Sequence, residues 1–255
     1  MIPVTKKIIC IDPGHGGADP GAVSLTGHEE SDQTLAIAKA IRAREDWLPE
    51  VKFVYTRMED KRLGDTPLED LTARVELANS AGADLFVSIH LNADNARQGR
   101  GIETFHFRNQ ATGWDSPEGK RLAQVIQKAT VKNTGLIDRG VKTAAFYVIR
   151  HTNMPAVLVE AGFIGGLPAE AELVVRPGYH AQVATGILQG IADCLGLVLE
   201  PPANWDPQAE VDRLLADGII NTPRDHKQSV TWGEFATLKN RERDKECGCK
   251  CQQNS

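Results

Sequence analysis

Short apolar runs alternate along the chain with longer segments in which apolar positions recur at helical spacing. The short runs predict strands over Lys7–Ile11, Lys52–Tyr55, Asp84–His90, Gly101–Phe107, Phe146–Ile149 and Ala156–Glu160. The longer segments predict amphipathic helices over Asp32–Arg44, Leu68–Ser80, Glu118–Asn133 and Tyr179–Leu195. This alternation is typical of an α/β domain, so we expect a mixed, largely parallel central sheet of about six strands flanked by helices.

The pattern changes after residue 199. Two adjacent prolines, Pro201 and Pro202, block helix continuation and favour an extended segment. We therefore predict a large domain over 1–199, a linker over 200–204, a small two-helix module over 205–243 and a disordered tail over 244–255. Three closely spaced cysteines lie in that tail, and their spacing is a poor match to a structural zinc site: Cys247, Cys249 and Cys251.

Composition and charge narrow the class of protein. Apolar residues make up 41% of the chain and charged residues 25%, which is typical of a globular protein. The net charge of -5 argues against a nucleic-acid partner, because phosphate binding needs a basic face. No apolar run approaches the ~20 residues that span a bilayer. The N-terminal residues also lack the pattern of a secretory signal, so we expect synthesis in the cytoplasm without a signal peptide.

Two histidines lie where predicted strands end. His15 belongs to Asp12–Gly17, which follows the first strand, and His90 closes the strand over Asp84–His90. Ligands collect outside the carboxyl ends of the strands of an α/β sheet. Two imidazoles at this edge, together with a carboxylate, could hold a zinc ion with one coordination position open.

The third ligand of such a site is expected near the start of the first predicted helix. His28, Glu29 and Glu30 all lie there, and their spacing relative to Leu35 does not choose between them. All three stay open on the residues alone.

Glu160 is the candidate acid/base. It ends an otherwise apolar run, where a carboxylate is costly to bury without a partner. Beside a metal it could accept a proton from water and pass it to a leaving nitrogen. The alternative is a structural ion pair with an arginine, for which Arg57, Arg74 and Arg150 are available.

Six motifs in register resemble the zinc-dependent N-acetylmuramoyl-L-alanine amidases of the amidase-3 type, a family of bacterial cell-wall enzymes. They are Asp12–Gly17, Asp19–Ala22, Ser88–Ala93, Arg100–Thr104, Arg139–Lys142 and Leu158–Ile164. The resemblance covers residues 6–195.

The resemblance implies a site and a reaction. His15, Glu30 and His90 would bind one zinc ion, with Glu30 selected over Glu29 by its spacing to the residues that follow. Glu160 would be the catalytic acid/base, and Asn92 a substrate contact. The implied reaction is hydrolysis of the amide bond between the lactyl group of N-acetylmuramic acid and L-alanine of the stem peptide in peptidoglycan.

The C-terminal segment has a separate resemblance. Residues 204–235 are similar to small helical modules behind lytic enzymes of Gram-positive bacteria and their phages, akin to half of an S-layer-homology unit. This segment is expected to bind cell wall or to self-associate. The resemblance favours a phage or prophage endolysin that reaches the wall through holin-type release or cell lysis.

Two other functions are considered beside the amidase. The same zinc site could serve a peptidase or amidohydrolase that acts on a small cytosolic amide. A catalytically dead wall-binding module is the alternative from another class, and the full set of His15, Glu30, His90 and Glu160 argues against it.

Overall fold

The computed structural model describes residues 6–200, in which six strands form one sheet of order β2-β1-β3-β6-β4-β5. The strands are β1 (Lys7–Pro13), β2 (Val51–Tyr55), β3 (Leu85–Ala93), β4 (Ile102–Phe107), β5 (Asp138–Ala144) and β6 (Ala156–Gly165). All neighbouring pairs are parallel except β4 with β6. The predicted mixed, largely parallel sheet of six strands is confirmed.

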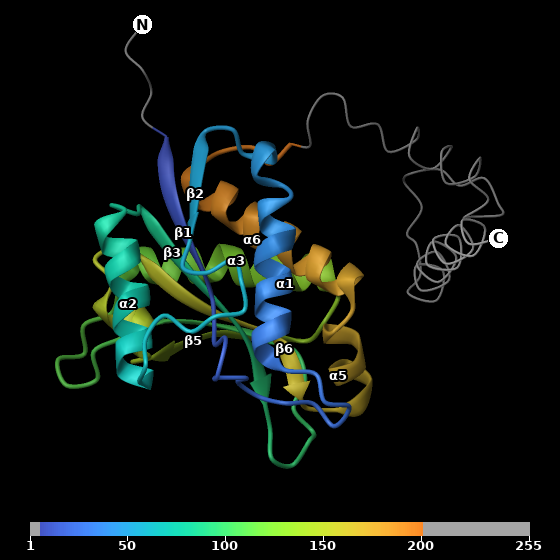
Figure 1. The fold of residues 1–255 in the computed structure, drawn as a ribbon. Helices are drawn as coiled ribbons and strands as arrows, with labels where there is room; N and C mark the ends of the chain where they lie inside the picture. Colours follow the sequence, from blue (N-terminus) through green and yellow to red (C-terminus); the bar gives the residue numbers. More distant parts are fainter. Residues whose placement is uncertain (1–5, 201–255) are drawn as a thin grey trace, which may run out of the picture. The chain divides into compact units, whose positions relative to one another are not determined.

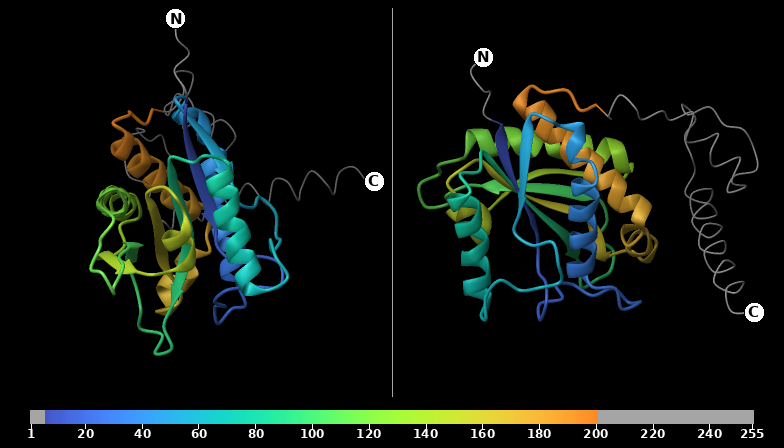
Figure 2. Two further views of the ribbon diagram at one scale, coloured as in Figure 1. Left: turned by 90° about the vertical axis from the view of Figure 1, so that its left-hand side faces the viewer. Right: turned by 45° about the horizontal axis from the view of Figure 1, so that its top comes forward.

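Helices cover both faces of this sheet. They are α1 (Glu30–Arg42), α2 (Pro67–Ser80), α3 (Pro117–Thr134), α4 (Tyr147–His151), α5 (Pro168–Val174) and α6 (Pro177–Leu195), with a 3-10 turn at Glu45–Trp47. Helices α2 and α4 pack on one face, and α1, α3 and α6 pack together on the other. Figure 2 shows α2 on the opposite side of the sheet from α3 and α6.

Burial on both faces explains the near-continuous apolar runs of the central strands. Cys10, Phe86 and Leu158 belong to the core under α2 and α4. The residues next to them in sequence point to the other face of the sheet. There Ile9 and Val87 are fully buried. The helix ends follow local signals as well: Thr66 caps α2 with a complete capping box, and α3 ends at Gly135 in the left-handed region.

One predicted strand is wrong and one strand was missed. The run Phe146–Ile149 forms the start of α4 and not a strand. Four apolar residues are too few to separate a helical turn from a strand by periodicity. The missing strand is β5, which lies at the sheet edge; its largely polar sequence, with Arg139 and Lys142, gives little hydrophobic signal.

Three parallel strands bring their carboxyl ends to one edge of the sheet. Figure 1 shows the ends of β3 and β6 beside the loop between β1 and α1. Since β4 runs antiparallel to β6, its first residues reach this same edge, and Glu103 pairs with Glu160. Side chains from four strands can therefore meet here.

The predicted linker over 200–204 continues beyond Glu200, and the two-helix module over 205–243 and the cysteine-containing tail over 244–255 lie wholly outside the described residues. Within residues 6–200, no helix combines the length and the apolar character that crossing a bilayer requires.

Candidate metal and catalytic site

The loop after β1 holds His15 in an unusual backbone conformation. Its φ is 62°, a region that residues other than glycine rarely adopt. Two buried arginines hold the loop in place through its carbonyl oxygens. Arg74 donates to the carbonyl oxygens of Pro13 at 2.8 Å and His15 at 2.7 Å, and Arg57 donates to that of Gly14 at 2.7 Å. The position of His15 therefore depends on contacts that are distant in sequence.

Arg74 belongs to a buried charge network. It forms ion pairs with Asp12 and Asp70, both at 2.8 Å. Asp12 also accepts hydrogen bonds from Thr56 and Ser88. Burial opposes the ionisation of Asp12, but Arg74 and the two hydroxyl groups outweigh it and hold the pKa of this carboxyl below its usual range. Arg74 thus supports the loop, and it is not the ion-pair partner considered for the candidate acid/base.

Glu30 is the first residue of α1 and lies against both histidines. Its Oε1 is 3.2 Å from Nε2 of His15 and 3.0 Å from Nδ1 of His90. The backbone amides of Ala22 and Leu91 donate to its two oxygens, at 2.9 Å and 3.0 Å. These bonds fix a carboxylate that is only 4% exposed. The ligand atoms of His15, Glu30 and His90 all lie within 4.8 Å of one another.

The other two candidates for the third ligand lie outside this cluster. His28 is exposed in the loop before α1. Glu29 is the N-cap residue of α1, and its side chain accepts a hydrogen bond from Ser31. A rotation of about 100° per helical residue separates Glu29 from Glu30. Of the three, the structure brings only Glu30 to the histidines.

Small residues and an aspartate set the orientation of the two imidazoles. The rings of His15 and His90 lie 4.9 Å apart in an edge-to-face arrangement. A Cβ atom on Gly14 would come within 2.3 Å of the His90 ring, so this close approach requires glycine. Asp19 bonds Nδ1 of His15 at 2.9 Å, which leaves Nε2 facing Glu30. A carboxylate behind a histidine is the usual support of a metal ligand.

The electrostatics of this cluster favour charged groups. Burial alone lowers the pKa of His15, but the carboxylates of Glu30 and Asp19 raise it to about 9. Burial opposes ionisation of Glu30 as well, yet the two imidazoles hold its pKa well below the usual range. Two nitrogen donors and one carboxylate form a set that suits a divalent metal ion, and these three residues could hold one.

Glu160 lies beside the cluster on β6. Its backbone pairs in register with His90 on β3. Its Oε2 is buried and has no hydrogen-bond partner among residues 6–200. Burial and the carboxylates of Glu30 and Glu103 raise the pKa of Glu160 to about 7, against the opposing effect of the imidazoles. A carboxyl group with this pKa can both accept and donate a proton near neutral pH.

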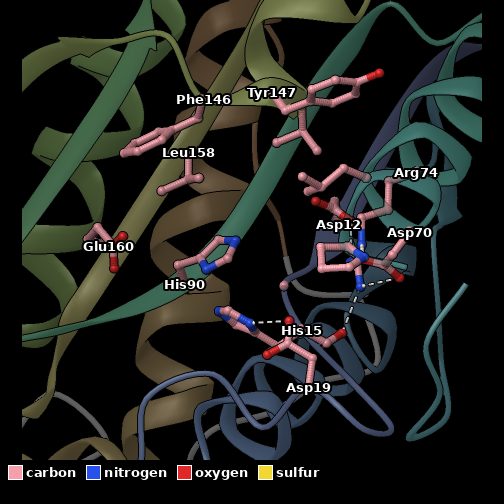
Figure 3. Close-up of a pocket in the computed structure, with 14 residues that line it drawn as sticks. Asp12, His15, Asp19, Asp70, Arg74, His90, Phe146, Tyr147, Leu158 and Glu160 are labelled. Atoms are coloured by element: carbon pink, nitrogen blue, oxygen red, sulfur yellow. Dashed lines mark hydrogen bonds and ion pairs between the residues drawn. The ribbon is translucent and has the colours of Figure 1, made fainter. Parts of the chain in front are cut away.

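One pocket connects these groups. Figure 3 shows His15, His90 and Glu160 around it, with Phe146 and Leu158 along an apolar side. Arg74 lines the side near β1 together with its carboxylate partners. The pocket is therefore charged near the candidate metal ligands and apolar above the candidate acid/base.

A second cluster of charged side chains, around Glu103, lies on the strand next to Glu160 and was not predicted from the sequence. Glu103 is 4% exposed and accepts hydrogen bonds from Arg139, Lys142 and Asn92. Asn92, predicted to contact substrate, thus has its side-chain amide bonded to Glu103 at 2.9 Å. The motifs Arg100–Thr104 and Arg139–Lys142 contain these residues, but no sequence spacing shows that the two motifs meet.

Fold and site together define a class: an α/β protein with the donor set and the neighbouring carboxyl group of a mononuclear metallohydrolase. The chain belongs to the Amidase_3 family, N-acetylmuramoyl-L-alanine amidase, whose model matches residues 9–193. The fold and family that the motifs implied are confirmed, and with them the class of enzyme.

Relatives of known name support this assignment. The chain is 39% identical over 188 residues to the N-acetylmuramoyl-L-alanine amidase LytC of Bacillus subtilis, covering 74% of this chain and 35% of LytC. It is 38% identical over 193 residues to the endolysin of Bacillus phage SPP1, covering 75% of this chain and 67% of the endolysin. The crystal structure of an N-acetylmuramoyl-L-alanine amidase from Clostridium difficile 630 is similar with a TM-score of 0.68 and 36% identity, over 75% of this chain and 98% of that one.

Proposed function

We propose that this chain hydrolyses the amide bond between the lactyl group of N-acetylmuramic acid and L-alanine of the peptidoglycan stem peptide. The observation that carries the proposal is the convergence of His15, Glu30 and His90 beside Glu160. Family membership supports the choice of bond. The apolar side of the pocket, with Phe146 and Leu158, offers a surface for the sugar or its lactyl group.

His15, Glu30 and His90 would hold a single zinc ion. Two histidines and one glutamate are a common ligand set of catalytic zinc sites, and they leave a position open for water or substrate. A zinc ion held there supplies Lewis-acid chemistry: it polarises an amide carbonyl and makes water acidic enough to ionise near neutral pH. Asp19 keeps Nε2 of His15 directed at this position by bonding Nδ1.

Glu160 would move the proton. Its carboxylate accepts a proton from the attacking water as the new carbon–oxygen bond forms. It then donates this proton to the alanine nitrogen as the carbon–nitrogen bond breaks, so the peptide leaves with a free amine and the lactyl group becomes a carboxylic acid. A pKa of about 7 suits both halves of this transfer.

The place of action would be the cell wall. The similarity to the SPP1 endolysin supports a lytic role of this kind. Recognition of the wall by residues 205–243, and release as a phage or prophage endolysin, stay predictions because they concern parts or steps that the described residues do not include.

The proposal is tested by digesting purified peptidoglycan and identifying the products by mass spectrometry. Amidase activity releases peptides that begin with L-alanine and leaves glycan strands intact. Cleavage inside the stem peptide would instead assign a peptidase. Sedimentation with the wall without any released product would assign a binding module, and turnover of small amides alone would favour a cytosolic amidohydrolase.

A further inference from the structure

Two cationic side chains lie at the edge of the site, and neither takes part in the proposed reaction. Arg139 and Lys142 on β5 both donate to Oε2 of Glu103, with Arg139 Nε at 2.6 Å. The guanidinium of Arg139 also stacks over the ring of Phe163, with 4.9 Å from Cζ to the ring centroid. These contacts fix both charged groups in place, although their side chains stay 35% and 40% exposed.

The two cations exceed what Glu103 needs. One buried carboxylate is neutralised by one cation, so Glu103, Arg139 and Lys142 together carry a net positive charge. The ammonium group of Lys142 has three N–H donors and uses one on Glu103. Nη2 of Arg139 makes no hydrogen bond within residues 6–200, while its Nη1 bonds the carbonyl oxygen of Arg100 at 3.3 Å. Donors thus remain for an anion that comes from solvent.

Two neighbouring carboxylates, Asp94 and Glu170, lie within electrostatic reach of Arg139, but their hydrogen bonds go to backbone amides. Asp94 accepts hydrogen bonds from the backbone amides of its own loop, among them Gly99. Glu170 is bonded by the backbone amides of Gly101 and Phe163. Neither Asp94 nor Glu170 forms an ion pair with Arg139 or Lys142, and within residues 6–200 the acidic partner that both cations share is Glu103.

The distance to Glu160 suits a specific part of the substrate. Glu103 pairs in register with Glu160, so the two backbones lie one strand spacing of ~4.8 Å apart. Arg139 and Lys142 reach from β5 to the carboxylate of Glu103, which places their charged groups about one strand spacing from the strand that carries the proton-transfer group. In the proposed reaction the alanine nitrogen lies at Glu160. The α-carboxyl group of the acidic residue after L-alanine lies roughly 6 Å from that nitrogen, because one residue spans about 3.5 Å.

We propose that Arg139 and Lys142 bind the α-carboxylate of the second stem-peptide residue and so orient the peptide for cleavage. This inference rests on the proposed function. Glu103 and Asn92 are the positioning residues, since they hold the cations through a buried carboxylate that is itself hydrogen-bonded on both oxygens. The site would therefore prefer peptidoglycan in which this carboxyl group is free over peptidoglycan in which it is amidated.

The test uses two preparations of soluble glycan strands that carry the same stem peptide, with the second residue either free or amidated at its α-carboxyl group. kcat/KM is measured on both for the wild type, for Lys142→Met and for the control Lys128→Met, an exposed lysine on α3 on the other face of the sheet. Loss of a charge-assisted hydrogen bond typically changes affinity by about tenfold. We expect the wild type and Lys128→Met to prefer the free carboxylate by about this factor, and Lys142→Met to lose most of the preference.

The possible outcomes distinguish failure of the carboxylate site from failure of the proposed amidase function. Equal rates of the wild type on both preparations would overturn the carboxylate site and leave the amidase intact. An equal loss of kcat/KM by Lys142→Met on both preparations would overturn it as well, because a merely structural role of Lys142 would not change the ratio of the two kcat/KM values. If the wild type cleaves neither preparation, the proposed function fails, and the carboxylate site fails with it.

Discussion

Glu160 and His90 face each other across two adjacent parallel strands, paired in register at the carboxyl edge of the sheet. Paired residues on neighbouring strands project to the same face, so an imidazole of the candidate metal site and the candidate proton carrier share one pocket. After this pair the register shifts, between His90 and Asn92. The regular part of the sheet thus ends at the site, and irregular backbone begins where substrate would approach.

Replacing Glu160 by glutamine should remove activity and keep the fold. The amide has nearly the same shape but can neither accept nor pass on the proton. We expect a loss of about 10²–10⁴-fold in kcat on peptidoglycan, the usual contribution of general acid/base catalysis. Kinetics on peptidoglycan and metal content measured on the same preparation check this. Retention of more than a tenth of wild-type kcat would contradict a proton-transfer role.

A matched pair of substitutions tests the metal site. Glu30→Gln weakens a ligand that bonds both histidines, whereas Glu29→Gln changes the adjacent N-cap residue, which lies outside the cluster. We expect about one zinc ion per chain in the wild type and in Glu29→Gln, and at least tenfold weaker binding in Glu30→Gln. Metal analysis after dialysis measures this. Equal zinc content in all three proteins would assign the metal elsewhere.

The raised pKa of Glu160 predicts a pH-dependent stability difference in metal-free protein. The folded-state pKa of about 7 exceeds the ordinary value of 4.5. Protonated Glu160 therefore favours the folded state below the ordinary pKa, and this contribution is lost as pH rises through about 7. Glu160→Gln stays neutral throughout. Its free energy of unfolding should thus rise relative to the wild type between about pH 5 and about pH 8.

Urea unfolding in the presence of a chelator measures this difference at both pH values. Added zinc should shrink it, because a cation next to Glu160 favours the ionised carboxylate. An exposed glutamate on α2, Glu76, provides the control substitution Glu76→Gln. A stability difference between Glu160→Gln and the wild type that is constant with pH would mean that Glu160 titrates at its ordinary value.

The buried arginine behind the site should matter for stability more than any surface ion pair. Arg74→Met leaves Asp12 and Asp70 buried without their partner and should cost about 3–5 kcal/mol of unfolding free energy. Lys7→Met breaks the exposed pair with Asp84 and should cost less than about 1 kcal/mol. Urea unfolding of the two variants compares them. A cost for Arg74→Met as small as that for Lys7→Met would contradict the role given to this network.

The fold was largely predictable because apolar periodicity reports burial directly. The central strands are buried on both faces, and for that reason the apolar runs over β1, β3 and β6 were correctly predicted to be strands. Edge strand β5 was not predicted because none of its residues is buried and its sequence is largely polar. The run that begins α4 was read as a strand, since a single buried turn and a short buried strand have the same composition.

The site was predictable only in part from local sequence. His15 and His90 could be placed because each lies near the carboxyl end of a strand, His15 two residues after β1 and His90 three residues before the end of β3. Helix phase left Glu29 and Glu30 undecided, and only the resemblance to a family chose Glu30, which the structure brings to the histidines. The residues that hold the site lie more than 20 residues in sequence from the groups that they contact. Arg57 and Arg74 bond the loop that contains His15, and Arg139 bonds Glu103. Such contacts depend on the tertiary fold, and no local pattern encodes them.

The most direct test is a zinc titration of metal-free protein, with release from peptidoglycan of peptides that begin with L-alanine as the readout. Activity of the wild type should be absent without zinc, rise in proportion to added zinc and level off at about one equivalent, as expected of a single catalytic site. Glu160→Gln should bind the same equivalent and release these peptides at least about 10²-fold more slowly. Peptide release by the metal-free wild type, or by zinc-loaded Glu160→Gln at the wild-type rate, would contradict a single metal at His15, Glu30 and His90 acting with Glu160.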